Sequence, residues 1–398
     1  MKYVCFLVDG MADEPIPELN HKTPLMAANT PNMNRLTRQS VQGMLLTLPE
    51  PFPTSSDVAN LSVLGYDLAA SYCGRGPIEA ISTGFPLQPD DIAFRLNLIS
   101  TEKDILTDYS AGQISSDLGK SIIAALNERL GDKKIIFYPG VSYRNILVLR
   151  GQEFSTRVAY HKPDSSHGRN INDIYPEAEA PEADVTVQVL SRIMNESKDV
   201  LRQFHKTGSK ASMVWPWSPG KKPHLTSFWD KYHKTAAVIS AVDVIKGIGL
   251  LAGMDVIKVP GVTGYLDTNF EGKGLHAFNC LKDHDFVYCH LEAVDETSHL
   301  GNLADKIRAI EYFDERLLGT FLKNAEAAHL LSDLVIGILP DHPVPIKLRA
   351  HTREPVPFMI YNHEKSDNFA EYNEDTGKTG SLGLLKADEF MRAMFELK

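Results

Sequence analysis

Cysteine is scarce in this 398-residue sequence. The four cysteines lie far apart and form no Cys-x-x-Cys pair, which argues against a zinc ribbon or a disulfide-stapled scaffold. No apolar run reaches the ~18 residues that a membrane span requires. The first run, Tyr3 to Val8, also lacks the basic leader of a secretory signal. We therefore expect a reduced, soluble, cytoplasmic protein with no membrane partner.

Basic residues are also in short supply. Lysine and arginine number 41 against 51 acidic residues, so the formal net charge is −10. A nucleic-acid groove needs clustered basic side chains, so the composition argues against a nucleic-acid partner. A small anionic substrate remains compatible, because it needs only a few local cations or metal ions. No GxxxxGK[ST] loop is present to cradle a nucleotide phosphate.

Four short β-rich apolar runs each lie next to acidic or imidazole side chains. The runs and their neighbours are Lys2–Val8 with Asp9, Phe286–Leu291 with Glu292 and Asp295, Leu334–Leu339 with Asp341 and His342, and Pro357–Tyr361 with His351 ahead of it. Ligands of open α/β sheets bind outside the carboxyl ends of the strands. The pattern therefore predicts one α/β sheet whose polar side chains converge on a single edge.

Such strand-end acids are missing between about residue 88 and residue 236. We therefore predict a discontinuous catalytic domain, residues 1–87 and 237–398, interrupted by a substrate-binding domain of residues 88–236. Within that insert, the stretch from Trp215 to Pro223 holds three prolines and a glycine. This composition excludes a regular helix or a central strand, and we expect a loop there.

Two pairs of residues have spacings that suit metal binding. Asp295 and His299 share one face if they lie on a helix, because their spacing is i, i+4. The adjacent pair Asp341 and His342 could serve two directions or two ions. Each pair also has a simpler interpretation, a surface Asp–His pair in the first case and a loop with a capping aspartate in the second.

Asp9 and His351 are weaker candidates when each is taken alone. Together with the two pairs they make three aspartates and three histidines at expected sheet ends. Such a mixed oxygen and nitrogen set suits Mn, Zn or Fe better than an oxygen-only calcium cage. Two ions ~3.5–4 Å apart would stabilise both the attacking and the leaving oxygen of a phosphoryl transfer.

The candidate nucleophile lies in the loop 54–56, just before an apolar-periodic segment. A serine at a helix start sits where backbone N–H groups and the helix dipole favour an anion, and a nearby metal ion would lower its pKa. The competing interpretation is a helix cap, because Thr54 and Asp57 have the spacing of a capping box. Local sequence by itself favours the cap.

Eight stretches of the sequence resemble the cofactor-independent phosphoglycerate mutases of the archaeal-type branch, within the alkaline phosphatase superfamily. They are FLVDGMAD, KTPLMAANTPNMNRL, SSDVANLSVLGYD, GRGPIEA, DTNFEGKG, EAVDETSHLGN, PDHPVP and HTREPVPF. The resemblance spans nearly the whole chain. It implies an α/β fold with an alkaline-phosphatase-like core sheet, helices on both faces and a smaller inserted α+β domain.

The resemblance also implies two divalent metal ions, from among Mn, Mg, Zn and Co. The ligands of the first would be Asp9, Asp341, His342 and the nucleophile Ser56. The ligands of the second would be Asp295, His299 and His351. Asn60 would fall near the phosphoryl group of a small phosphorylated substrate.

The implied activity is a glycolytic isomerisation of 3-phosphoglycerate to 2-phosphoglycerate through a phosphoserine at Ser56. The freed glycerate must stay trapped away from water until its other hydroxyl takes the phosphoryl group back. Side chains that could hold the glycerate carboxylate or carry protons are Arg75, Arg95, Asp164, His167, Arg169, Lys246 and Lys273. Each of these could instead be a solvated surface charge.

The chain departs from that branch at one place. Many of the branch's members carry Arg-Gly-x-Gly where this sequence has Trp215 to Gly220, which resembles a bacterial subgroup proposed to act as homoserine kinases. The two tryptophans either pack the insert or reshape the substrate pocket. A homoserine kinase, a phosphomonoester hydrolase and a catalytically silent scaffold are therefore the alternatives to a mutase. The oligomeric state and the native metal stay open.

Overall fold

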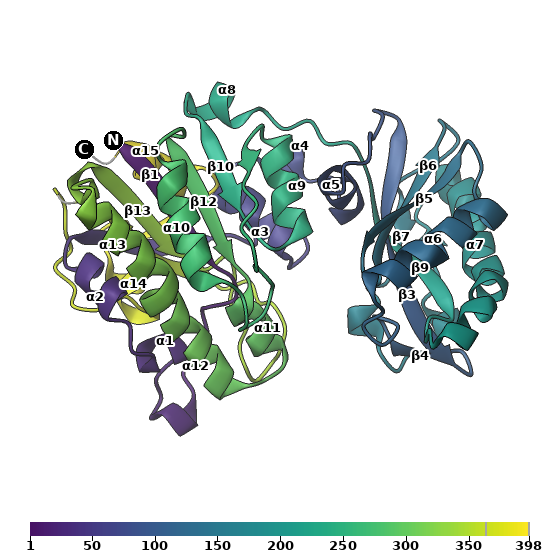
Figure 1. Ribbon diagram of the computed structural model, residues 1–398, viewed down its shortest axis with the longest axis horizontal. Coiled ribbons are helices and arrows are strands. Elements are labelled where there is room, and N and C mark those ends of the chain that lie inside the picture. The colour runs from purple at the N-terminus through teal and green to yellow at the C-terminus, as the bar shows by residue number, and fades with distance from the viewer. Residues whose placement is uncertain (363, 397–398) are drawn as a thin grey trace. The chain divides into compact units, whose positions relative to one another are not determined.

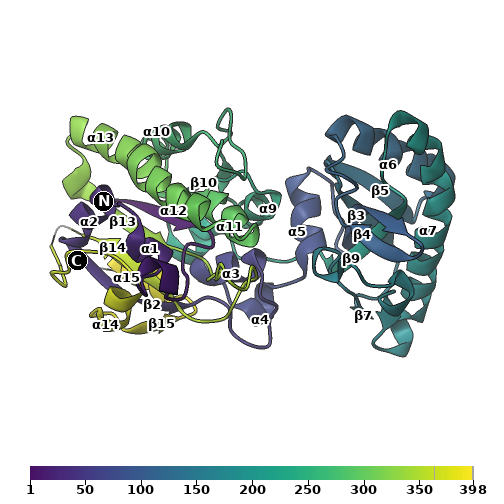
Figure 2. The ribbon, with the colours of Figure 1, turned by 90° about the horizontal axis from the view of Figure 1, so that it is seen from below.

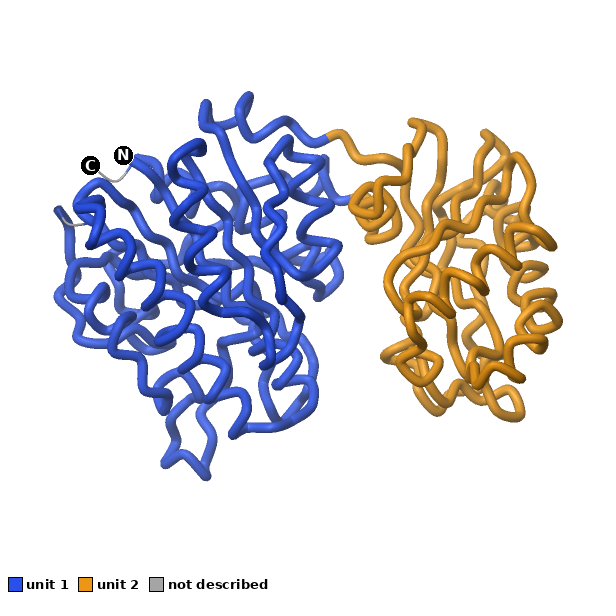
Figure 3. Tube along the Cα trace, viewed as in Figure 1, with its two compact units in different colours: residues 1–72, 225–398 blue, residues 73–224 orange. Residues whose placement is uncertain are grey.

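The computed structural model describes residues 1–362 and 364–396 (Figure 1). The chain divides into two compact units, shown in different colours in Figure 3. Unit 1 comprises Met1–Tyr72 and Leu225–Lys398, and unit 2 comprises Cys73–His224. The sequence prediction placed the corresponding boundaries after residues 87 and 236, so helix α5, Arg75–Ser82, lies in unit 2 rather than before it.

Unit 1 is built on an eight-stranded sheet of order β11-β10-β12-β1-β13-β14-β2-β15. In that order the strands are Asp255–Val256, Ala236–Ile239, Phe286–Leu291, Lys2–Val8, Leu334–Leu339, Val356–Tyr361, Ser40–Leu46 and Leu384–Lys386. All neighbouring pairs are parallel except those of β14, which runs antiparallel to both β13 and β2. Three of the four predicted strands have the predicted bounds, and the fourth begins one residue earlier.

Helices cover both faces of this sheet (Figure 2), which confirms the predicted α/β class. One face packs against α2 (Pro31–Thr37), α10 (Phe270–Cys280), α12 (Leu303–Tyr312) and α13 (Gly319–Ala327). The side chains of Phe6 and Phe321 meet there edge to face, with centroids 5.1 Å apart. The other face carries α3 (Ser56–Val63), α9 (Asp243–Leu251) and α15 (Glu389–Glu396). Within the described residues every helix is too short or too polar to cross a bilayer.

Unit 2 has a smaller antiparallel sheet of order β4-β3-β6-β5, in which β9 also pairs with β3. Its strands are β3 (Asp91–Glu102), β4 (Ile105–Asp108), β5 (Ile135–Val141), β6 (Arg144–Arg150) and β9 (Met213–Lys221). Two long helices, α6 (Ser116–Leu130) and α7 (Asp184–Arg202), pack on one face of the sheet through an apolar core. Helix α5 packs on the other face, where Ala80 meets Ala93 and Ile146.

The prediction of a loop from Trp215 to Pro223 is wrong for most of that segment, because residues 213–221 form strand β9. Within the described chain β9 pairs with β3 alone, so it is an edge strand and not a central one. Proline is tolerated at an edge because its missing amide hydrogen costs no ladder bond on the solvent side. The ladder also shifts register opposite Ala93 to Arg95, where Ser218 adopts a φ of 50°.

A buried ion pair ties together the two loops that leave the central strands of unit 1. The ammonium of Lys306 is fully buried and donates to Asp13 Oδ2 at 2.8 Å and to the Val344 carbonyl at 2.9 Å. Asp13 Oδ2 also accepts the backbone N–H of Ile346 at 3.1 Å. Asp13 follows β1, and Val344 and Ile346 follow β13. The network therefore holds together the two backbone segments that leave these neighbouring strands.

Replacing Lys306 with methionine keeps most of the side-chain volume but leaves a buried carboxylate unpaired. We expect Lys306→Met to lower the free energy of unfolding by about 3–5 kcal/mol in urea denaturation. Arg35→Ala is the matched control, because the pair of Arg35 with Glu326 lies on the surface and should contribute at most about 1 kcal/mol. Equal stability of the two variants would contradict a structural role for the buried pair.

Candidate active site at the carboxyl edge of the sheet

Strand direction brings the candidate residues of unit 1 to one edge of the sheet. Strands β1, β12 and β13 are parallel neighbours, so the residues that follow them leave at the same edge. Strand β14 runs the opposite way, so its beginning lies at that edge too. His351, which stands ahead of β14, therefore joins Asp9 and Asp341, which follow β1 and β13.

The first group of side chains surrounds the imidazole of His342. Its Nε2 lies 3.2 Å from the hydroxyl of Ser56, 3.5 Å from Asp9 Oδ1 and 3.4 Å from Asp341 Oδ2. The two aspartates and the histidine are fully buried. Four residues that are as much as 333 positions apart in the sequence thus meet around one nitrogen atom.

The second group lies on α11 (Ala293–His299) and the loop before β14. Asp295 Oδ2 is 3.4 Å from His299 Nε2, so the expected i, i+4 pair does share a helix face. Asp295 Oδ1 is 3.5 Å from His351 Nε2, and the Nε2 atoms of the two histidines are 2.9 Å apart. The ring of His351 also stacks on that of His342, with centroids 3.8 Å apart, which joins the two groups.

Ser56 is the first residue of α3, and its hydroxyl faces the cluster and not the helix backbone. The capping-box interpretation of Thr54 and Asp57 is wrong. The residue at the N-cap is Ser55, and no side chain caps the helix there. Ser56 therefore stands at the start of a helix, and its hydroxyl contacts the cluster instead of capping that helix.

Sequence reasoning missed His290 and did not assign Glu292 to the site. His290 Nε2 lies 3.2 Å from Asp9 Oδ2 and 3.8 Å from Glu292 Oε2. These two residues and Asp9 form one of the groups that could hold a metal ion. A signal for His290 was present, since it is a polar residue near the carboxyl end of a strand that delivers other acids, but the apolar run around it indicated only core.

Burial and mutual repulsion set the ionisation of the carboxylates. Burial, followed by the charges of Asp341, Asp295 and Glu292, raises the pKa of Asp9 well above its usual value. Burial and nearby acids also raise the pKa of Asp341 to about 6 and that of Glu292 to about 8. Burial and repulsion therefore disfavour the ionised forms of these three carboxyl groups, and a nearby cation would favour them.

The imidazoles of the second group lower the pKa of the carboxyl group beside them. Burial opposes ionisation of Asp295, but the adjacent imidazoles of His299 and His351 outweigh it and hold the pKa of Asp295 well below its usual value. Burial likewise lowers the pKa of His299, yet Asp295 more than compensates and raises it to about 9. Among the acids of the cluster, Asp295 is thus the one whose ionised form is favoured by its surroundings.

The residues fit divalent metal ions. The buried oxygens Asp9 Oδ1 and Asp295 Oδ1 have no hydrogen-bond donor, although each faces an imidazole nitrogen. A cation would supply the missing partner for each oxygen, and carboxylates with imidazoles suit Mn or Zn. Three ligand groups occur among the described residues: Asp9 with Asp341 and His342, Asp295 with His342 and His351, and Asp9 with His290 and Glu292.

Asn60 lies inside the cluster. Its amide nitrogen donates to the Ser56 carbonyl at 2.8 Å and to Asp341 Oδ2 at 3.0 Å, and its oxygen accepts the hydroxyl proton of Tyr288 at 2.6 Å. These three hydrogen bonds are made within the protein, and Asn60 links the backbone of Ser56 on α3 to a candidate metal ligand.

Of the predicted substrate-binding cations, Arg75 and Arg95 come together in unit 2, where both pair with the buried carboxylate of Glu79. Burial raises the pKa of Glu79, but the two arginines lower it further than burial raises it. The guanidinium of Arg95 also lies over the ring of Trp217, 5.2 Å from its centroid. Two guanidinium groups therefore lie beside one buried carboxylate.

The other predicted substrate residues occupy different places. Asp164, His167 and Arg169 are exposed on a short segment of unit 2. Lys246 lies on α9 of unit 1, where it pairs with Asp243 at 2.6 Å. Lys273 is fully buried and donates to the backbone carbonyl of His290 at 2.8 Å, so its contact is structural.

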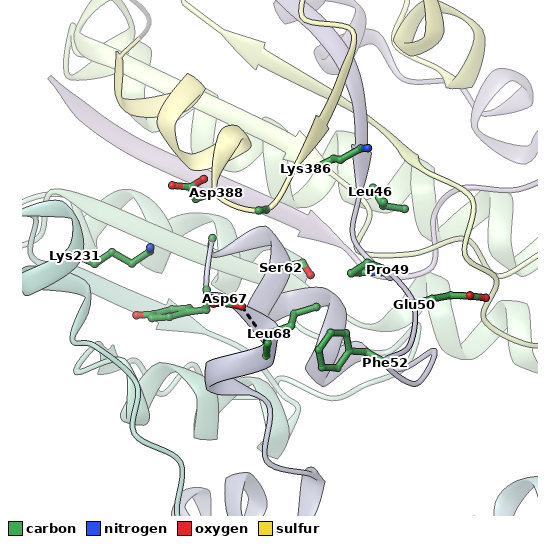
Figure 4. A pocket seen from close by; sticks show the side chains of 14 residues that line it. Leu46, Pro49, Glu50, Phe52, Ser62, Asp67, Leu68, Lys231, Lys386 and Asp388 are labelled. Atoms are coloured by element: carbon green, nitrogen blue, oxygen red, sulfur yellow. Dashed lines mark hydrogen bonds between the residues drawn. The ribbon is translucent and has the colours of Figure 1, made fainter.

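A separate cavity of about 500 Å³ lies elsewhere in unit 1 (Figure 4). Its walls include the apolar side chains of Leu46, Phe52 and Leu68, and Lys231 and Lys386 also line it. None of the carboxylates or imidazoles of the cluster lines this cavity. The candidate chemistry is therefore at the sheet edge and not in this pocket.

Comparison with known proteins points to one family. The family model for 2,3-bisphosphoglycerate-independent phosphoglycerate mutase matches residues 37–206. A protein of Methanosarcina acetivorans that carries this name is 44% identical over 394 residues, 98% of each chain. Another from Methanothermobacter thermautotrophicus, named 2,3-bisphosphoglycerate-independent phosphoglycerate mutase 2, is 41% identical over 405 residues, which cover 100% of this chain and 98% of the relative.

Two solved structures cover the whole chain. The cofactor-independent phosphoglycerate mutase of Thermoplasma acidophilum superposes with a TM-score of 0.65 at 26% identity, over 100% of both chains. A protein from Pyrococcus horikoshii superposes with a TM-score of 0.82 at 26% identity, over 100% of this chain and 97% of the other. The likeness therefore includes both units of the chain.

Cation binding should stabilise the folded protein, because it relieves the repulsion among the buried carboxylates. We expect protein stripped with EDTA to melt at a higher temperature when Mn²⁺ is added, with a gain of about 2.7 kcal/mol at a metal concentration a hundredfold above Kd. Differential scanning calorimetry measures this shift. The shift should shrink in His351→Ala but not in His329→Ala, which changes a histidine outside the cluster. An unchanged metal titration in His351→Ala would contradict its assignment.

Proposed function

Because the chain belongs to the family of 2,3-bisphosphoglycerate-independent phosphoglycerate mutases, we propose that it interconverts 3-phosphoglycerate and 2-phosphoglycerate by a metal-dependent reaction through a phosphoserine at Ser56. The observation that carries the proposal is the hydroxyl of Ser56 lying 3.2 Å from His342 at the centre of a buried cluster of carboxylates and imidazoles. An ordinary helix cap would not turn its hydroxyl toward such a cluster.

The ligands of one ion would be Asp9, Asp341, His342 and Ser56, and those of a second would be Asp295, His299 and His351. Such ions supply the positive charge that lowers the pKa of a serine hydroxyl and stabilises a phosphoryl group in transfer. The native ions would come from among Mn, Mg, Zn and Co, since each of these suits part of this set of carboxylate and imidazole ligands.

The reaction consists of two displacements at phosphorus. In the first, Ser56 Oγ gives up its proton and forms a bond to phosphorus while the bond from phosphorus to the substrate oxygen O3 breaks, and O3 takes up a proton as glycerate is released into the site. In the second, glycerate O2 gives up its proton and bonds to phosphorus, while the bond from phosphorus to Ser56 Oγ breaks and Oγ takes up a proton. The start of α3 presents backbone N–H groups to the transferred phosphoryl group.

The glycerate must stay bound between the two displacements, and its carboxylate provides the handle. Arg75 and Arg95 are the proposed partners, because a guanidinium grips a carboxylate with two parallel hydrogen bonds and the two lie together beside Glu79. Asp164, His167, Arg169 and Lys246 remain proposed contacts or proton carriers. Exclusion of water is essential, since water attacking the phosphoserine would make the enzyme a phosphatase.

Ser56→Ala should abolish mutase turnover, because the variant lacks the atom that accepts the phosphoryl group. We expect a loss of about 10⁴-fold or more, the usual cost of deleting a nucleophile. Turnover of 3-phosphoglycerate is followed with enolase as the coupling enzyme, and acid-quenched wild type is searched by mass spectrometry for a phosphorylated Ser56 peptide. Ser55→Ala is the matched control and should keep wild-type turnover.

Three outcomes would overturn the proposal. Substantial turnover in Ser56→Ala would reject this serine as the nucleophile. ATP-dependent phosphorylation of homoserine without mutase turnover would establish the kinase alternative, and release of free phosphate without 2-phosphoglycerate would establish the hydrolase. The buried Trp215 and Trp217 donate their indole protons to the His161 carbonyl and to Asn97 Oδ1, contacts within unit 2 that favour a packing role for both.

A further inference from the structure

Strand β12 places two fully buried aromatic side chains behind the cluster. Tyr288 and His290 are two residues apart, so they point to the same face of the sheet, the face that carries α3. Neither residue reaches Ser56. We infer that both are positioning residues, Tyr288 acting through Asn60 and His290 acting directly on Asp9. The inference rests on the proposed function, because it treats Asp9 and Asp341 as metal ligands.

Tyr288 orients the amide of Asn60. Its hydroxyl donates to Asn60 Oδ1 at 2.6 Å, which leaves the amide nitrogen on the opposite side. That nitrogen has two protons, and it donates to the carbonyl of Ser56 and to Asp341 Oδ2. One hydroxyl on β12 therefore completes the set of bonds that joins the backbone of the nucleophile to a carboxylate ligand.

Ser240 fixes which nitrogen of His290 carries the proton. Its hydroxyl oxygen accepts the N–H of Val242 at 3.0 Å and lies 3.2 Å from His290 Nδ1, so its own proton is available to that nitrogen. On the other side of the ring, Nε2 faces the carboxylates of Asp9 at 3.2 Å and Glu292 at 3.8 Å. With the Ser240 proton available to Nδ1, the tautomer that carries the ring proton on Nε2 makes both hydrogen bonds, one from Ser240 and one to Asp9.

The result is a chain of donors that ends at Asp9. His290 donates from Nε2 to Asp9 Oδ2, and this bond turns the second oxygen, Asp9 Oδ1, toward His342 at 3.5 Å. Asp9 Oδ1 has no hydrogen-bond donor. His290 thus occupies one oxygen of the aspartate and leaves the other for a cation. Lys273 steadies the same point of the strand by donating to the His290 carbonyl.

A competing arrangement uses the same atoms differently. Asp9, His290 and Glu292 lie close enough to hold a cation of their own. That arrangement requires an unprotonated Nε2, whereas the hydrogen bonds of Ser240 and Asp9 favour a protonated one. Metal stoichiometry separates the two, because a third site would add one bound ion that depends on His290.

The test removes single oxygen atoms from behind the cluster. Tyr288→Phe and Ser240→Ala each delete one hydroxyl and alter no atom of a proposed metal ligand. The matched controls are Tyr372→Phe, whose buried hydroxyl donates to the Pro357 carbonyl at 2.7 Å, and Ser40→Ala, whose buried hydroxyl donates to the Leu36 carbonyl at 2.8 Å. Binding of Mn²⁺ to the full-length protein is titrated by electron paramagnetic resonance, and kcat and KM for 3-phosphoglycerate are measured across metal concentrations.

We expect Tyr288→Phe and Ser240→Ala to bind Mn²⁺ about 10- to 100-fold more weakly than wild type, the usual effect of losing a residue that orients a metal ligand. The metal concentration for half-maximal kcat should rise in parallel, with kcat recovered at saturating Mn²⁺ and KM for 3-phosphoglycerate unchanged. The two controls should bind Mn²⁺ as wild type does. A purely structural loss would instead lower the melting temperature without moving the metal titration.

The outcomes distinguish this inference from the function on which it rests. A wild type that binds neither Mn²⁺ nor any of Mg²⁺, Zn²⁺ and Co²⁺ would refute the metal-dependent mutase itself. A wild type that binds Mn²⁺, with both variants binding it equally tightly, would refute the positioning role alone. Equal weakening in variants and controls would also refute it. A His290→Asn variant that loses one bound ion while Ser240→Ala loses none would replace the inference with a third metal site.

Discussion

Repulsion among carboxylates buried at one sheet edge is the constraint on which the rest of this structure depends. The four acids involved are Asp9, Glu292, Asp295 and Asp341. Burial and mutual repulsion raise the pKa of three of them, while two imidazoles hold Asp295 ionised. An arrangement of this kind is costly to fold unless cations or fixed donors compensate it. The hydrogen-bond donors around the cluster offset part of that cost. The carboxylate oxygens that have no donor are the places where cations would offset the rest.

The reversed direction of β14 decides how the cluster is completed. If β14 were parallel to β13, the loop that holds His351 would leave at the far edge of the sheet. Because it is antiparallel, His351 stacks on His342 and contacts Asp295. The buried pair of Lys306 with Asp13 then ties together the segments that follow β1 and β13. Site geometry and fold stability therefore depend on the same loops.

How far the sequence predicts the site depends on whether each signal is local. The i, i+4 spacing of Asp295 and His299 indicated a shared face, since a single helix turn sets it. His290 was missed because a histidine inside an apolar strand gives no sign of which carboxylate will face it. The prolines near Trp215 and Trp217 indicated a loop, yet an edge strand accepts them, and whether a strand lies at an edge is a property of the whole sheet.

By itself the sequence determined the four strands, the acids and imidazoles at their ends, and membership of a family, because hydrophobic runs and long motifs are read from neighbouring residues. Only the tertiary structure decided that Ser56 faces His342, that Tyr288 reaches Asn60 and that His290 bonds Asp9. These contacts join residues more than 200 positions apart. Their distances follow from strand order and strand direction, which no local stretch of sequence specifies.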